Sequence, residues 1–157
     1  MRFVVDSMLG TLARKLRIFG FDSLYYNDID DDKLLSIVLN SDRVLLTSDK
    51  ELFKRVISKN GRCILVNSND EDNLVKILSY LGLKLKFALD NSRCPLCNEP
   101  LKRYDKIYLK ELIPKKVYDT NDEFYLCSRC KKVYWKGSHI KRLLELENRV
   151  NKKIANS

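Results

Sequence analysis

Four cysteines stand in two pairs whose spacing is typical of a structural metal site. Cys94 and Cys97 form one Cys-x-x-Cys motif, and Cys127 and Cys130 form the second. Both thiolates of such a motif can face one ion from a tight turn, so the two motifs together supply four ligands for a tetrahedral Zn²⁺ with no open position. We therefore predict a structural Zn²⁺ ion rather than a catalytic one, and we favour it over free or redox-active thiols.

The 29 residues between the motifs exceed the roughly 15–20 residues of the shortest zinc-binding pattern, so a β-hairpin insert is expected there. Because that segment has a thin core, the metal would supply much of its folding energy. The fifth cysteine, Cys63, lies in an apolar run and is best explained as a small buried side chain. An odd number of cysteines argues against a disulfide framework.

Acidic side chains follow three of the predicted strands. Asp6 comes directly after the first apolar run, the stretch Asp28–Asp32 follows the second, and Asp49 follows the third with Glu51 close behind. The carboxyl ends of parallel strands meet at one edge of a sheet, where neighbouring strands are about 4.8 Å apart, so these carboxylates could share one site. Carboxylates without nearby His or Cys favour Mg²⁺ or Mn²⁺, and such a cation can activate water for phosphodiester hydrolysis.

Each of these acids also has a simpler explanation as a helix cap. Asp6 could cap the first helix, Asp30–Asp32 lie where a helix N-terminus favours negative charge, and Asp49 with Ser48 could form another cap. For each acid alone, we favour the cap. Taken together, the acids are more numerous than caps require, so we favour a shared metal site.

Basic residues are concentrated in the second half of the chain. Residues 1–90 hold 14 basic and 13 acidic side chains, whereas residues 91–157 hold 16 basic and 8 acidic ones. Lys and Arg interleaved with Tyr and Trp suit single-stranded RNA, because phosphates pair with cations and bases stack on rings. The alternative is that the lysines are solvated and the aromatic side chains form a small core.

Four residues near the second Cys motif are the candidate nucleic-acid ligands: Lys131, Lys132, Lys136 and His139. His139, the only histidine, could contact a phosphate or donate a proton, or be an ordinary surface or packing side chain, and its sequence position leaves both open. For Tyr125 and Tyr134 we favour a place in the core.

The elements that must position these residues alternate along the first half of the chain. Apolar runs predict strands at residues 3–5, 22–26, 44–46 and 63–66, and apolar residues at helical spacing follow each of them. This alternation predicts an α/β fold in which helices cover both faces of a parallel sheet. Period-2 alternation at residues 83–89 then predicts an edge strand or an extended linker.

We expect two domains, residues 1–90 and residues 91–157. The second would be a four-cysteine zinc ribbon followed by a C-terminal helix that begins at Ser138 as its N-cap. With 45% hydrophobic and 32% charged residues, 5 Gly and 3 Pro, the composition excludes collagenous, low-complexity and wholly disordered chains. Without a long apolar run, and with Asp6 where a signal peptide would stay apolar, we expect a cytoplasmic protein with no membrane segment.

Five segments together resemble the Mut-seven C-terminal RNase domain family across nearly the whole chain. They are the stretch Val5–Arg17, the stretch Asp30–Leu35, the stretch Arg43–Leu52, the two Cys motifs, and Tyr134-Trp-Lys-Gly-Ser-His139. This resemblance implies a PIN-like nuclease domain fused to a zinc ribbon, and hence a metal-dependent ribonuclease. By motif position it places the family's acids on Asp6, Asp31 and Asp49, with Asp32 and Glu51 as neighbours that could assist.

The chain departs from the family pattern at two places. The third block usually reads Thr-Arg-Asp, whereas this chain has Thr47-Ser48-Asp49 and so lacks a basic side chain that could meet phosphate. Asn98 and Lys131 stand where many zinc ribbons have Gly after the Cys motif. Neither departure removes a candidate ligand.

The leading hypothesis is therefore a Mg²⁺- or Mn²⁺-dependent ribonuclease whose ribbon helps to bind RNA. The alternative is a non-catalytic RNA-binding or ribosome-associated adaptor with a degenerate nuclease body. A phosphoacceptor receiver domain would fit Asp49, but such domains have paired acids after the first strand, and here Ser7 follows Asp6.

Overall fold

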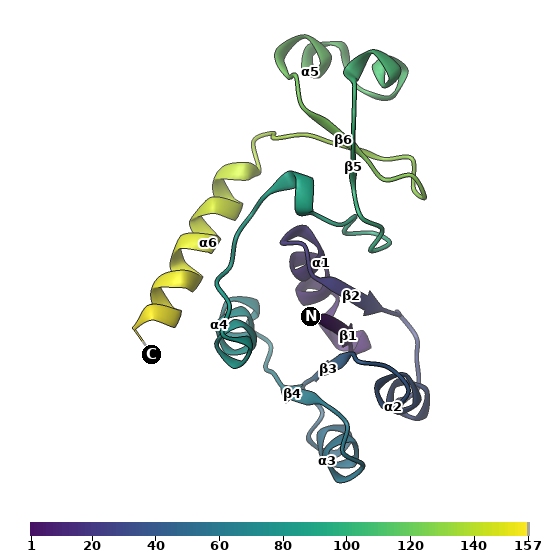
Figure 1. The fold of residues 1–157 in the computed structure, drawn as a ribbon, viewed down its shortest axis with the longest axis vertical. Helices are drawn as coiled ribbons and strands as arrows, with labels where there is room; N and C mark the ends of the chain where they lie inside the picture. Colours follow the sequence, from purple (N-terminus) through teal and green to yellow (C-terminus); the bar gives the residue numbers. More distant parts are fainter. Residues whose placement is uncertain (157) are drawn as a thin grey trace.

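A four-stranded parallel sheet forms the body of the protein in a computed structural model that describes residues 1–156 (Figure 1). Its strands are β1 (Arg2–Val5), β2 (Asp22–Tyr25), β3 (Val44–Thr47) and β4 (Cys63–Leu65), in the order β2-β1-β3-β4. Every neighbouring pair is parallel. The predicted α/β fold with a parallel sheet is confirmed.

Helices cover both faces of the sheet. One face carries α1 (Gly10–Ile18), α4 (Asp70–Leu81) and α6 (Ile140–Ala155), and the other carries α2 (Asp31–Leu39) and α3 (Lys50–Ser58). This arrangement follows from the two central strands, because the apolar runs Phe3–Val5 in β1 and Val44–Leu46 in β3 are fully buried and supply core residues to both sides.

The alternation of side chains along β1 shows how the two cores are built. Phe3 and Val5 lie in the core beneath α1, α4 and α6, whereas Val4 lies in the core beneath α2 and α3. All three side chains are fully buried. The edge at which β1 and β3 end is therefore held rigidly from both sides.

Residues 83–88 form an extended linker rather than an edge strand. The side chain of Asn151 in α6 bonds both backbone groups of Leu85, at 2.8 Å each, and Glu147 accepts from the Phe87 N–H at 3.1 Å. These side chains take the place of a neighbouring strand. The short helix η2 (Leu89–Asn91) then leads into the first Cys motif.

The second sheet is antiparallel and belongs to the ribbon. It consists of β5 (Lys102–Tyr104), β6 (Phe124–Leu126) and β7 (Val133–Tyr134). β5 and β6 pair as the expected hairpin would, but their connection holds three short helices: η3 (Lys106–Tyr108), η4 (Lys110–Leu112) and α5 (Lys115–Thr120). Leu109 and Ile113 in this connection pack against Phe124, so the insert has a small core of its own.

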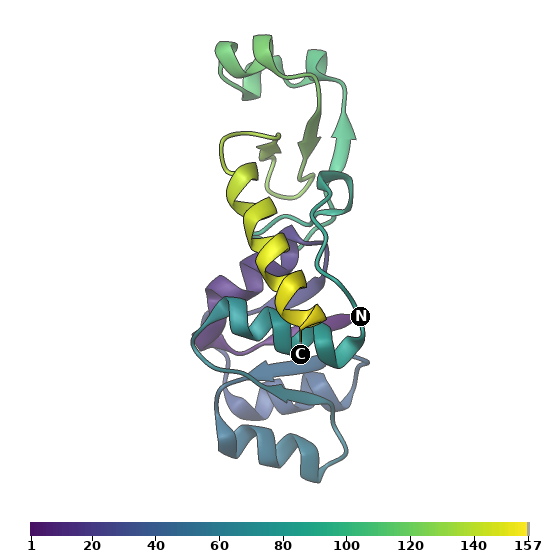
Figure 2. The same cartoon turned by 90° about the vertical axis from the view of Figure 1, so that its left-hand side faces the viewer.

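After the ribbon, α6 returns to the body. It runs from the base of the ribbon alongside α4, and its Leu146 and Val150 lie in the core of the sheet (Figures 1 and 2). Its N-terminal flanking residue is His139, without a side-chain cap, so the expected Ser138 cap is wrong. How the chain divides into domains stays a prediction. None of the helices within residues 1–156 has the length and apolar character needed to cross a membrane.

Candidate functional site

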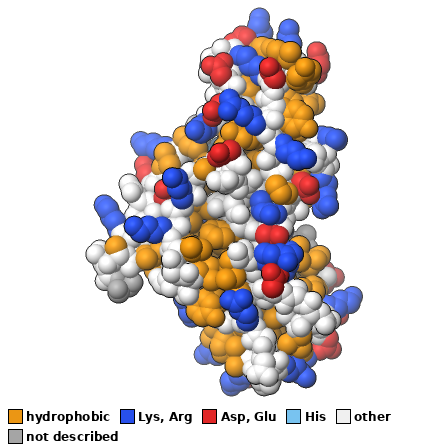
Figure 3. Space-filling view, in the orientation of Figure 1, with side chains coloured by type: hydrophobic (Ala, Val, Ile, Leu, Met, Phe, Trp, Pro, Cys, Tyr) orange, Lys and Arg blue, Asp and Glu red, His pale blue; other side chains and the backbone are white. Residues whose placement is uncertain are grey.

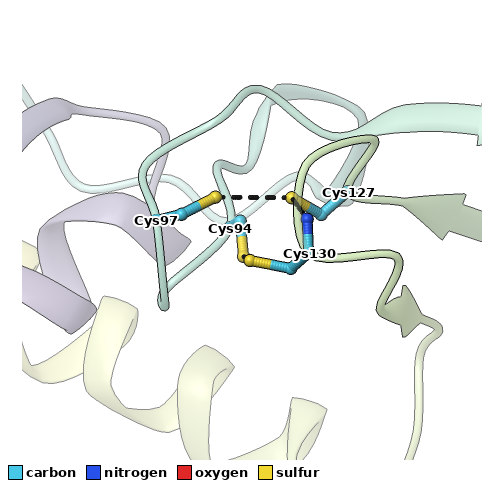
Figure 4. Close-up of side chains that lie close together, drawn as sticks. All are labelled: Cys94, Cys97, Cys127 and Cys130. Atoms are coloured by element: carbon cyan, nitrogen blue, oxygen red, sulfur yellow. Dashed lines mark hydrogen bonds between the residues drawn. The ribbon is translucent and has the colours of Figure 1, made fainter.

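The four cysteines of the two motifs gather at one point, as their spacing predicted. Their sulfur atoms all lie within 4.8 Å of one another, with Cys97 Sγ 3.4 Å from Cys127 Sγ and Cys94 Sγ 4.0 Å from Cys130 Sγ (Figure 4). The set is positioned to hold a metal ion. Four thiolates without an open position are a donor set that suits structural Zn²⁺.

Two turns of the same construction position the sulfur atoms. In each, the residue after the Cys-x-x-Cys motif bonds back to the first cysteine: the Asn98 N–H to the Cys94 carbonyl, and the Lys131 N–H to the Cys127 carbonyl, both at 2.8 Å. Asn98 and Lys131 have φ angles of 74° and 59°. This left-handed conformation explains why Gly is common at these two positions in zinc ribbons.

Hydrogen bonds prepare the Cys94 thiol for ligation. Burial alone would raise its pKa, but the Tyr134 hydroxyl, 3.3 Å from Cys94 Sγ, and the backbone N–H groups of Leu96 and Cys97 lower it to about 7. Tyr134 and the buried Tyr125 pack in the ribbon core, as expected. The thiolate form that a metal ion requires is thus favoured at this position.

The first Cys motif is also fastened to the body of the protein. Asn98 Oδ1 accepts from the Ser23 N–H at 3.0 Å, and Asn98 Nδ2 donates to Asp22 Oδ1 at 2.7 Å. Arg17 Nη1 donates to the Pro95 carbonyl at 2.9 Å. The ribbon therefore has a defined position beside β2.

At the carboxyl edge of the sheet, Asp6 follows β1 and is only 7% exposed. Its Oδ1 accepts from the Ser7 N–H and so caps the short helix η1 (Ser7–Leu9), and its Oδ2 accepts from Thr47 Oγ1, both at 2.7 Å. Thr47 Oγ1 in turn accepts from the Asp49 N–H at 3.0 Å. Thr47, which the sequence analysis did not single out, thus links two of the predicted acids.

The other two acids of the predicted site lie at helix starts. Asp49 caps α3, because its Oδ1 accepts from the N–H groups of Glu51 and Leu52 at 2.9 and 3.1 Å. Asp30 rather than Asp31 caps α2, by accepting from the Lys33 N–H. The Asp31 carboxylate is left without a hydrogen bond or ion pair to any residue in the described range.

The three predicted acids interact electrostatically. The pKa of Asp31 is raised, first by desolvation and then by the negative charges of Asp49 and Asp6, while Arg55 opposes the shift. Over residues 1–156, however, the four cysteines are the only set of three or more metal-ligating side chains close enough to hold an ion. The acids therefore act on one another without being gathered as a ligand cage.

The two acids that were predicted to assist, Asp32 and Glu51, have cationic partners. Asp32 Oδ1 accepts from Arg55 Nη2 at 2.6 Å, and Glu51 lies 3.7 Å from Lys54 at an exposed position. The Arg55 guanidinium also faces Asp31. A basic group, Arg55, thus lies beside the acids although this chain has Ser48 where the family pattern has arginine. The contact depends on the packing of α2 on α3, so the sequence alone does not reveal it.

A groove opens between the end of α1, the ribbon and the start of α6. It has a volume of about 730 Å³, is largely apolar, and includes Tyr134 and Trp135. Its charged lining residues are all basic: Arg93, Lys132 and Arg142. Lys and Arg side chains also gather on the α6 lobe at the left of Figure 3.

Two of the four predicted nucleic-acid ligands line this groove and two lie outside it. Lys132 and His139 are lining residues. Lys136 instead lies 3.9 Å from Glu123, and Lys131 is exposed on the turn after the second Cys motif. Their roles in binding stay predictions.

Comparison with known proteins agrees with this arrangement. The Mut7-C RNAse domain matches residues 1–146, which includes the sheet, both Cys motifs and the start of α6. The chain belongs to the Mut7-C RNase domain family. Membership in this family supports a nuclease-like function.

A curated relative of this chain is the human protein named exonuclease mut-7 homolog. It is 31% identical over 101 residues, which cover 62% of this chain and 12% of that protein. The chain thus spans only a small part of this relative's length. No solved structure matches the chain.

Proposed function

We propose that this chain is a PIN-like ribonuclease that cuts single-stranded RNA with a Mg²⁺ or Mn²⁺ ion held by Asp6, Asp31 and Asp49. The observation that carries the proposal is that Thr47 Oγ1 bonds both Asp6 Oδ2 and the Asp49 N–H at the carboxyl edge of the sheet. In addition, the pKa of Asp31 is raised, first by desolvation and then by the negative charges of these two acids. Carboxylates that repel one another in this way are a site that a cation stabilises.

The oxygen atoms needed for a cation are available. Neither oxygen of Asp31 accepts a hydrogen bond from residues 1–156, and Asp49 Oδ2 accepts none within the same range. Asp6 Oδ2 accepts one hydrogen bond and retains a second lone pair, whereas Asp6 Oδ1 accepts from both the N–H and the hydroxyl of Ser7. When bound there, a divalent cation would lower the pKa of a water molecule and offset the charge that develops on phosphate.

The groove beside α6 supports RNA as the substrate. Lys132 and Arg142 can pair with phosphates, while the partly exposed ring of Trp135 offers a stacking surface for an unpaired base. We propose that Zn²⁺ on the four cysteines keeps this wall of the groove folded. Lys131 and Lys136 would contact the RNA outside the groove.

The sharpest test replaces Asp31, because its side chain has no structural bond to lose. Purified protein is incubated with fluorescently labelled single-stranded RNA and Mn²⁺, and cleavage is followed on a gel. Asp31→Asn should abolish cleavage without changing the unfolding midpoint. Asp28→Asn is the matched control, since Asp28 is an exposed acid in the same stretch, and it should retain activity.

One observation favours the non-catalytic adaptor as a second candidate. Asp6 and Asp49 are both committed to helix caps, and the acids are not gathered as closely as the cysteines in the described part of the chain. For the adaptor, calorimetry would detect no Mn²⁺ binding that depends on Asp31, yet RNA affinity would remain and fall with added salt. Cleavage that survives Asp31→Asn unchanged would refute the assignment of the site.

A further inference from the structure

A small polar cavity adjoins the acidic edge of the sheet on the α1 side. Its volume is about 190 Å³, and Gly10, Arg14 and Arg17 form one wall at the i, i+4, i+7 spacing of a single helix face. Tyr25 and Asn27 at the end of β2, and Pro95 and Leu96 of the first Cys motif, complete it. The only charged residues that line this cavity are the two arginines.

Arg17 is fixed in place at the base of this cavity. It is 5% exposed, and its Nε and Nη1 donate to the carbonyls of Ser23 and Pro95 at 2.8 and 2.9 Å. Both acceptors are neutral. The nearby Asp22 partly balances the charge of Arg17, but Asp22 is itself paired with Arg43.

Arg14, by contrast, is exposed and has no ion-pair or hydrogen-bond partner for its side chain within residues 1–156. The next residue, Lys15, pairs with Asp70 at 2.8 Å. Arg14 is close enough to Arg17 that its positive charge contributes to lowering the pKa of Arg17, after the larger effect of burial. Two guanidinium groups thus face one polar cavity with no carboxylate in its lining.

The cavity is connected to the candidate active site through two hydrogen bonds. The Tyr25 hydroxyl donates to the Ser7 carbonyl at 2.7 Å, and the Ser7 N–H donates to Asp6 Oδ1 at the same distance. Gly10 leaves room for the ring, because a Cβ there would lie 3.0 Å from Tyr25 Oη. The cavity and the acids therefore lie on the same edge of the sheet.

We propose that the cavity lined by Arg14 and Arg17 binds a phosphate of the RNA chain adjacent to the one that is cut. The inference rests on the proposed nuclease function, whose acids would act on the neighbouring phosphodiester. Guanidinium groups match phosphate oxygens in geometry and remain charged at all relevant pH values. The cavity is small and polar, which fits a phosphate rather than a base.

Binding is tested apart from cleavage by using the Asp31→Asn protein without divalent cations. Fluorescence anisotropy of labelled single-stranded RNA is measured at several salt concentrations with and without Arg14→Gln. The variant should bind about tenfold more weakly, and the slope of log affinity against log salt should fall by about 0.7, as for one lost phosphate contact.

Arg62→Gln is the matched control. Like Arg14, Arg62 is exposed, and its side chain has no hydrogen bond or ion pair in the described range. It precedes β4, however, and so lies at the amino ends of the strands, away from the acids. It should change affinity by less than about twofold. If Arg14→Gln and Arg62→Gln weaken binding equally, the effect is one of net charge and the proposal is wrong.

A second measurement separates this proposal from the nuclease assignment. Inorganic phosphate is titrated into the protein while the Nε–H resonances of Arg14 and Arg17 are followed by NMR. Saturable shifts at both resonances in the wild type, with the Arg17 shift lost in Arg14→Gln, would support the phosphate site even if the protein cuts no RNA. RNA cleavage with an unchanged KM in Arg14→Gln, together with unshifted resonances, would overturn it.

Discussion

Thr47 Oγ1 donates a 2.7 Å hydrogen bond to Asp6 Oδ2 and accepts a 3.0 Å bond from the Asp49 N–H. One hydroxyl therefore fixes two acids that follow different strands. Because Thr47 is fully buried, Thr47→Val would leave Asp6 Oδ2 and the Asp49 N–H without this hydrogen-bond partner. The free energy of unfolding should fall by about 1–3 kcal/mol. Cleavage should slow by about tenfold or more, because Asp6 and Asp49 are no longer held in a fixed position relative to each other.

Urea unfolding and RNA cleavage with Mn²⁺ measure these two effects. Thr47→Ser keeps the hydroxyl and should retain most of the activity. If Thr47→Val cuts RNA at the wild-type rate, Thr47 does not position the acids.

Asn98 combines a left-handed backbone with two side-chain hydrogen bonds to β2, so its replacements should separate the two contributions. Asn98→Ala loses both bonds and retains the backbone strain, and should lower the free energy of unfolding by about 2–3 kcal/mol. Asn98→Gly relieves the strain and should be about 1 kcal/mol more stable than Asn98→Ala.

Lys131 provides the control for this series, because it shares the left-handed conformation but its side chain is exposed. Lys131→Gly should therefore stabilise the protein by about 1 kcal/mol in urea unfolding, opposite in sign to Asn98→Gly. An Asn98→Gly variant more stable than the wild type would show that the bonds to β2 contribute less than the relief of backbone strain.

Removal of the metal should unfold the ribbon and leave the body folded. Trp135 is the single tryptophan, is half-buried and packs against Phe124 at a ring distance of 6.2 Å, so its fluorescence reports on the ribbon. A strong chelator should shift its emission to longer wavelength, while the far-UV circular dichroism of the body helices is largely kept.

The cysteine variants control for the chelator itself. Cys127→Ser should show the shifted emission before chelator is added, whereas Cys63→Ser should respond as the wild type does. Elemental analysis should find one zinc ion per chain. Emission that stays unchanged after the metal has been removed would contradict a structural role for it.

Part of the protein's stability depends on the ionisation of Asp22 and therefore changes with pH in the acid range. Burial alone would raise its pKa, but hydrogen bonds and charges from Arg43, Asn98 and Arg93 lower it from 3.8 to about 2. The stabilisation by its carboxylate is therefore fully present above pH 3.8 and is lost as the pH falls through about 2.

Asp22→Asn should consequently be less stable at neutral pH, by about 1 kcal/mol after allowance for solvent screening, and should lose less stability between pH 4 and 2. Thermal unfolding at several pH values measures both effects. Asp42→Asn, which removes an exposed partner of Arg2, is the control and should leave the profile nearly unchanged. Parallel pH profiles for Asp22→Asn and the wild type would contradict the assignment.

The sheet and its helices could be predicted because their signals are local. Uninterrupted apolar runs such as Val44–Leu46 mark strands buried on both faces, and the pattern changes at Gly82, which ends α4 with a φ of 67°. The helical insert at residues 106–120 was not predicted. Its fold depends on contacts of Leu109 and Ile113 with Phe124, which local periodicity does not reveal.

The metal centre could likewise be predicted from spacing, whereas the acidic site could be predicted only in outline. Both explanations considered for Asp6 and Asp49 are consistent with the structure, since they cap helices and also influence Asp31. That Asp30 rather than Asp31 caps α2 depends on the backbone conformation of single residues. The contact of Arg55 with Asp32 joins residues 23 positions apart and requires tertiary packing.

The return of α6 to the core determines how the ribbon is attached. Leu146 and Val150 pack in the same core as Leu74 and Ile77, so the polypeptide leaves the body before the first Cys motif and rejoins it after the second. The ribbon is therefore an insertion anchored at both ends rather than an arm that swings on one hinge. A single proteolytic cut between residues 94 and 139 would leave both fragments bound to one another through the α4–α6 contact.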